Sequence, residues 1–145
     1  MKNKFMLLYM VVAVAIFLTA CNNELDITQS FPFTVETMPV PKEVKEGETV
    51  EIRCSLKADA DFSGTSYTMR YFQYDGNGLL RIGKDGEQLI PNDRYPVRKG
   101  DFRLYYTSKS TEQQSLEIVF EDNHGQSQVL KLDFNNKRDD LNANE

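Results

Sequence analysis

Few side chains of this chain are of types that could do chemistry. It contains one histidine, His124, and two cysteines, Cys21 and Cys54. A catalytic triad needs a histidine beside both a nucleophile and an acid, but His124 stands between Asn123 and Gly125 in a turn-like run. One cysteine and one histidine also fall short of the four ligands of a structural zinc site. We therefore predict no enzyme activity, no catalytic residues, no metal and no cofactor.

The acidic residues form no recognisable site. The run Asp75-Gly76-Asn77-Gly78 begins like a calcium loop, but Leu79 and Gly86 occupy the fifth and twelfth positions, where that loop requires ligands. The carboxylate pairs Glu121-Asp122 and Asp139-Asp140 fall in turn and tail contexts. We interpret the first run as a turn, and the carboxylate pairs as solvated charge.

A lipidation signal is the clearest functional feature. Lys2 and Lys4 precede the apolar run from Phe5 to Ala20, and Leu18-Thr19-Ala20 leads directly into Cys21. The run has 16 residues, whereas a helix needs about 20 to span the hydrocarbon core, so a secretory signal fits better. This layout resembles a bacterial lipoprotein signal. It implies a signal peptide over residues 1–20, lipidation of Cys21, and a lipid-anchored protein of the cell envelope, on the outer membrane or the periplasmic face. Ordinary signal-peptidase cleavage is the alternative.

The charge of the mature chain argues against nucleic acid as a partner. Lys2 and Lys4 leave with the signal, so 15 of the 17 basic residues remain against 22 acidic ones, and the net charge is about −7. Phosphate contact is made by clustered Lys and Arg, so we predict no direct nucleic-acid binding.

The rest of the chain predicts a single all-β domain. Residues 21–30 comprise the cysteine and a mostly polar segment, which we interpret as a flexible tether. Residues 135–145 are almost wholly polar, and we predict that they form a disordered tail. Between them, over residues 31–134, short runs of alternating apolar residues are separated by turn clusters. These runs predict an immunoglobulin-like β-sandwich of about seven antiparallel strands. The Asp75–Gly78 turn predicts a hairpin between two of them. The predicted strands are Phe31–Met38, Thr49–Lys57, Tyr67–Tyr74, Leu79–Ile82, Gln88–Ile90, Phe102–Thr107, Ser115–Phe120 and Gln128–Phe134.

The run Glu46 to Leu56 resembles the second strand of an immunoglobulin-type domain. Alternation within it places Cys54 in the core, where a free cysteine behaves as a small hydrophobic residue. The antibody-type framework is absent, however. The chain has no Trp, and it lacks a partner cysteine near Ile118 or Phe120 and the tyrosine two residues before it.

Outward-facing aromatic and arginine residues provide a candidate interaction face. If Tyr67, Met69 and Tyr71 point inward, the residues between and after them point outward, and Arg103 and Tyr105 likewise oppose the buried set of their strand. Tyrosine and arginine dominate binding hot spots. The candidate face comprises Arg70, Phe72, Tyr74, Arg103 and Tyr105. The alternative is that loops or a neighbouring strand cover some of these side chains.

Eight segments carry a further signal: residues 18–26, Phe31–Pro41, Gly47–Cys54, Arg70–Gln73, Pro91–Pro96, Phe102–Ser108, Phe120–Asp122 and Gly125–Gln126. Together they resemble one known family, the TraQ proteins of Bacteroides-type conjugative transposons. The resemblance implies an accessory component of a DNA-transfer apparatus that contacts other conjugative transfer proteins of the envelope. It transfers no catalytic or ligand residues. Two alternative functions remain: a surface lipoprotein that binds glycan or a neighbouring cell, and an inhibitor of redundant transfer.

Overall fold

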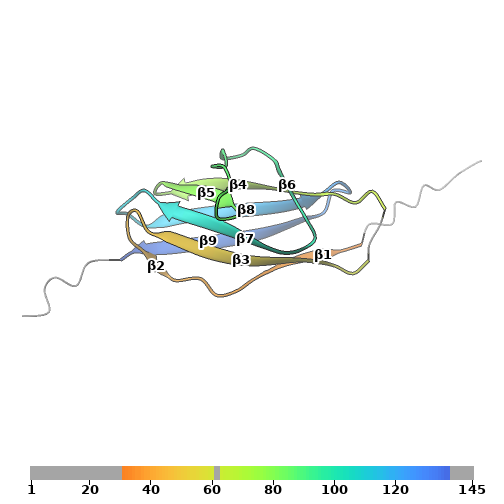
Figure 1. Cartoon of the computed structure of the whole chain (residues 1–145), viewed down its shortest axis with the longest axis horizontal. Coiled ribbons are helices and arrows are strands. Elements are labelled where there is room, and N and C mark those ends of the chain that lie inside the picture. Colours follow the sequence, from red (N-terminus) through yellow and green to blue (C-terminus); the bar gives the residue numbers. More distant parts are fainter. Residues whose placement is uncertain (1–30, 61–62, 138–145) are drawn as a thin grey trace, which may run out of the picture.

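The computed structural model describes residues 31–60 and 63–137 (Figure 1). The predicted signal peptide, the lipidation site Cys21, the tether up to Ser30 and most of the predicted tail lie outside these ranges. Among the described residues, no helix is long and apolar enough to cross a membrane.

The described residues form nine strands in two sheets that lie one over the other (Figure 1). The first sheet has the order β1-β3-β7-β5 and the second β2-β9-β8-β4-β6. All neighbours are antiparallel except β2 and β9. The strands of the first sheet are β1 (Phe33–Thr37), β3 (Thr49–Ala58), β7 (Gly100–Ser108) and β5 (Gly78–Ile82). Those of the second are β2 (Glu43–Val44), β9 (Ser127–Asn136), β8 (Gln114–Asp122), β4 (Tyr67–Asp75) and β6 (Tyr95–Val97).

The core lies between the sheets and follows the alternation of the sequence. Side chains on a strand point to opposite faces in turn, so buried residues alternate with others along most of β3 and β8. In β7 the alternation ends in three consecutive buried residues, Tyr106 to Ser108. Cys54 is 3% exposed and belongs to this core, as predicted. Met69 and Tyr71 are buried, and Tyr67 is partly buried and packs against the core, which confirms the predicted inward face of β4.

The neighbour relations confirm the predicted sandwich. The first sheet corresponds to strands A, B, E and D of the immunoglobulin fold, and β9, β8 and β4 to G, F and C. β2 and β6 extend the second sheet at its two edges. Neither was predicted, because one has two residues and the other contains Pro96, which is unfavourable inside a ladder. β9 also continues to Asn136, two residues past the predicted end of the domain.

The predicted hairpin at Asp75–Gly78 is wrong. Its turn carries the chain from β4 in the second sheet to β5 in the first, where β5 pairs with β7. The edge of β4 that a hairpin partner would need is occupied by β6 and by Asn92, whose backbone N–H donates to the carbonyl of Tyr71. The predicted strand Gln88–Ile90 is reduced to an isolated bridge between Gln88 and Arg81.

Candidate interaction surfaces

The five residues of the predicted interaction face do not lie together. Arg70, Phe72 and Tyr74 belong to β4 in the second sheet, whereas Arg103 and Tyr105 belong to β7 in the first. The outer faces of the two sheets look in opposite directions, so the prediction of one shared face is wrong. Alternation identifies which residues leave the core, but it does not identify the sheet to which each strand belongs.

The outer face of β4 carries a continuous stack, which we call the β4 ladder: Arg70, Phe72 and Tyr74. The guanidinium carbon of Arg70 lies 5.6 Å from the centre of the Phe72 ring. Phe72 is in turn stacked on Tyr74, with ring centres 6.3 Å apart and planes 15° from parallel. Tyr74 is 63% exposed. The ladder therefore ends in an aromatic side chain that a partner can reach.

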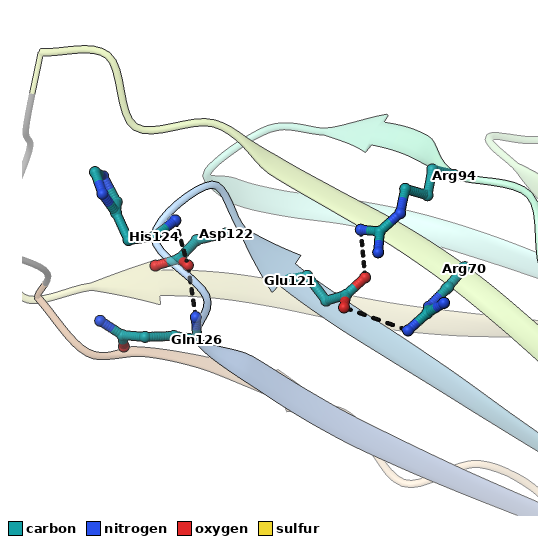
Figure 2. A network of polar contacts seen from close by, with 6 residues as sticks. All are labelled: Arg70, Arg94, Glu121, Asp122, His124 and Gln126. Carbon is teal, nitrogen blue, oxygen red and sulfur yellow. Dashed lines mark hydrogen bonds and ion pairs between the residues drawn. The ribbon is translucent and has the colours of Figure 1, made fainter.

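Glu121 on β8 fixes the arginine end of this ladder. One carboxylate oxygen lies 3.3 Å from a terminal nitrogen of Arg70, and the other lies 2.5 Å from a terminal nitrogen of Arg94, in the loop before β6 (Figure 2). Glu121 is only 20% exposed, so this carboxylate is screened less than a fully exposed one. The Glu121 carboxylate thus links strand β4, through Arg70, to the loop before β6, through Arg94.

The adjacent β8–β9 turn is structural. The carboxylate of Asp122 accepts hydrogen bonds from the backbone N–H groups of His124 and Gln126, at 2.9 and 2.8 Å (Figure 2). The ring Nε2 of His124 lies 3.1 Å from the hydroxyl of Thr65. Asp122 binds the backbone of His124, and in the described residues no carboxylate contacts the His124 ring. The arrangement is a stabilised turn, in line with the composition of Asp122 to Gly125.

The outer face of the first sheet is organised around Glu51. Its Oε1 lies 2.8 Å from Nε of Arg53 and 3.4 Å from Nε of Arg103. The hydrogen bond from Arg53 lowers the pKa of the Glu51 carboxyl most strongly. The charges of Arg103 and Arg53 and a hydrogen bond from Tyr105 lower it further, against some desolvation. Arg103 and Tyr105, the two predicted residues of this sheet, are therefore engaged in an intramolecular polar cluster.

A shallow hollow of about 550 Å³ lies beside this cluster, across β1, β3 and β7. Ser55 sits between Glu36 and Asp101 in the strand register, and its short side chain leaves a gap among longer neighbours. Arg53 and Arg103 line the other end. The two ends of the hollow therefore carry opposite charges, and the hollow as a whole does not favour an ion of either charge.

The groups that could react are placed unfavourably for reaction. Burial raises the pKa of the Cys54 thiol to about 12, so the nucleophilic thiolate is scarce at neutral pH. Residues 31–60 and 63–137 hold no group of three or more metal-ligating side chains. The structure presents surfaces for contact. Among them, the β4 ladder is built from aromatic and arginine side chains and has an exposed end.

Comparison with known proteins supplies the biological context. A family model described as TraQ conjugal transfer protein matches residues 4–137. A solved conjugative transposon lipoprotein from Bacteroides eggerthii is 53% identical, covering 74% of this chain and 100% of that one, with a TM-score of 0.67. A lipoprotein from Bacteroides thetaiotaomicron is 50% identical over 86% of this chain and 97% of that one, with a TM-score of 0.68. A conjugate transposon protein from Bacteroides vulgatus is 51% identical over 85% and 99%, with a TM-score of 0.64. A comparison with curated proteins gave no match.

Proposed function

The chain belongs to the TraQ conjugal transfer protein family, and we propose that it is a non-enzymatic accessory of a conjugative transposon's transfer apparatus. In this proposal it acts at the cell envelope by binding another transfer protein through the β4 ladder. Similar proteins from Bacteroides are named lipoproteins, which implies association with the envelope. Lipidation of Cys21, at the end of the lipoprotein-like signal, would hold the domain there.

The observation that carries the binding proposal is the geometry of the β4 ladder. Phe72 and Tyr74 are stacked and Arg70 is held against them by Glu121, so the three side chains are ordered before a partner arrives. Binding then costs less side-chain entropy than it would for freely rotating groups. Aromatic and arginine side chains also contribute more binding energy than other residue types. A protein partner fits these properties.

The test is complementation of a donor strain that lacks the gene. The double variant Phe72→Ala/Tyr74→Ala removes the exposed part of the ladder, whereas Lys131→Ala removes a highly exposed side chain elsewhere on the same sheet and serves as the matched control. We expect deletion to lower transfer, the control variant to restore it and the ladder variant to fail, although the ladder variant is present and folded. Loss of two hot-spot contacts corresponds to a fall in affinity of about tenfold or more.

The same strains separate the proposal from its alternatives. Crosslinking in intact donor cells should recover another transfer protein with the control variant and much less of it with the ladder variant. Unchanged transfer after deletion would contradict the accessory role and favour glycan or cell binding. Increased uptake by a recipient that lacks the gene would instead identify an inhibitor of redundant transfer. A Cys21→Ser variant tests the anchor, and we expect it to leave the membrane fraction.

A further inference from the structure

Among the residues that the structure describes, β1 forms the most open sheet edge of the sandwich. An edge strand presents unpaired backbone groups that template pairing with another strand. Within the described ranges, the edge of β5 is partly covered, because the N–H of Leu89 donates to the carbonyl of Leu80 at 2.8 Å. β6 is interrupted by Pro96, and β2 has only two residues. β1 is five residues long and lies at the lower margin of the ribbon in Figure 1.

The register identifies the groups of β1 that face outward. The N–H of Met38 donates to the carbonyl of Arg53, and the N–H of Asp59 donates to the carbonyl of Pro32. In an antiparallel pair, hydrogen-bonded and non-hydrogen-bonded residue pairs alternate. The backbone N–H and C=O groups of Thr34 and Glu36 therefore point to β3. The same groups of Phe33, Val35 and Thr37 point away from β3. In the described residues no hydrogen bond is formed by the outward N–H and C=O groups, which belong to Phe33, Val35 and Thr37.

We propose that β1 pairs antiparallel with β1 of a second copy of this chain, about a twofold axis at Val35. Val35 then faces its own equivalent, and Phe33 faces Thr37 of the second copy. These pairs form about six backbone hydrogen bonds. The first sheets of the two copies become one continuous sheet. The inference concerns a surface that the β4 ladder does not include, so it does not depend on the proposed partner.

The charges on the outer face favour this register. In the single chain, Lys57 lies 2.6 Å from Glu36, and both side chains are exposed. With the axis at Val35, Glu36 lies opposite Thr34 of the second copy, in the same row as that copy's Lys57. An axis at Glu36 would instead place the two Glu36 carboxylates opposite each other, which is unfavourable. Opposite charges in this row thus favour a second copy as the partner and disfavour an axis at Glu36.

The flanking prolines limit the pairing to β1, and a shared membrane would raise its yield. Pro32 and Pro39 bound the strand on both sides, so the paired stretch cannot extend far beyond β1. A twofold pair uses the same edge of both copies and therefore closes on itself. Pairing of two short strands is weak in dilute solution. Two copies held on one membrane surface meet at a much higher effective concentration, so dimers form where the copies share a membrane.

Disulfide trapping tests the twofold axis directly. The full chain carrying Val35→Cys is produced in cells, and its envelope fraction is treated with a mild oxidant. Facing residues in a hydrogen-bonded pair have Cα atoms about 5.5 Å apart, within the range of about 4.4–6.8 Å for a disulfide. In the matched control, Thr37→Cys, the two cysteines lie about 14 Å apart along the strand. The wild-type chain measures background from its own cysteines. We expect at least about tenfold more linked dimer from Val35→Cys than from either control.

A charge exchange in the Val35→Cys chain distinguishes specific pairing of β1 from random collision of two copies. Lys57→Glu places a carboxylate in the row of Glu36 of the second copy, and we expect the linked dimer to fall about fivefold. Adding Glu36→Lys restores opposite charges and should restore the yield. Both positions are exposed, so the fold is spared. Equal linking of Val35→Cys and Thr37→Cys would overturn the proposal, as would a yield that ignores the charge exchange.

Discussion

A buried polar chain at the β7–β8 turn allows a quantitative test of the fold. The hydroxyl of Tyr106 donates to the side-chain carbonyl of Gln114 at 2.6 Å, and the Gln114 amide nitrogen donates to the hydroxyl of Ser108 at 2.8 Å. All three residues are 0% exposed. The Tyr106 ring is also stacked on Phe134, with centres 5.5 Å apart and planes 7° from parallel. Tyr106→Phe removes the hydroxyl and preserves this stacking.

The expected cost of Tyr106→Phe follows from the group that it orphans. A buried acceptor left without a donor costs about 1–3 kcal/mol, so the free energy of unfolding should fall by about 2 kcal/mol. Equilibrium urea unfolding, followed by far-UV circular dichroism, measures the change. With a urea dependence of about 1–3 kcal/mol per molar, the midpoint should move down by about 1 M at an unchanged slope.

A second variant decides whether the orphaned carbonyl is the cause. In Tyr106→Phe/Gln114→Leu both members of the buried pair become apolar. Gln73, whose Oε1 lies 3.3 Å from the Tyr106 hydroxyl, is only partly buried and keeps its hydrogen bond to the carbonyl of Asp75. Ser108 keeps its hydrogen bond to the carbonyl of Ser110. Replacing both partners is close to neutral, so the double variant should recover most of the lost stability. The reasoning is refuted if Tyr106→Phe lies within about 0.5 kcal/mol of the wild type, or if the double variant is less stable than Tyr106→Phe.

Three further predictions address the thiol, the edge strand and the crossover turn. Burial raises the pKa of Cys54 from 9.0 to about 12, so between these values the folded chain retains a proton that the unfolded chain has released. Stability should therefore fall as pH rises through this range, by at most about 1.4 kcal/mol per pH unit from this group, and Cys54→Ala should flatten the slope in urea titrations. Glu36→Pro removes an N–H that points to β3, whereas Val35→Pro removes one that points to the open edge. Thermal unfolding of the dilute chain should thus show a clearly larger loss for Glu36→Pro, and equal losses would contradict the assigned register. Gly78→Ala places a methyl group against the hydroxyl and the ring of Tyr106, closer than van der Waals contact allows. It should cost about 1–3 kcal/mol in the urea assay, and a neutral result would show that the turn can shift.

The family and the class of fold were predictable from the sequence. The resemblance to the TraQ family is confirmed by the matching family model, and the all-β sandwich is confirmed by the two packed sheets. Lipidation of Cys21 and the binding role of the outward aromatics remain predictions. The reading of Cys54 as a core residue succeeded because one apolar position in every two indicates a half-buried strand without reference to its partners.

What only the tertiary structure decided is which strands lie side by side. The alternation in β4 and β7 correctly placed Phe72 and Arg103 outside the core, yet these residues lie on opposite faces of the molecule. The turn at Asp75–Gly78 was recognised, but its destination was the other sheet. Alternation and turn chemistry are set by neighbouring residues. Strand partners are chosen by contacts between residues far apart in the chain, and these form only when the two sheets pack.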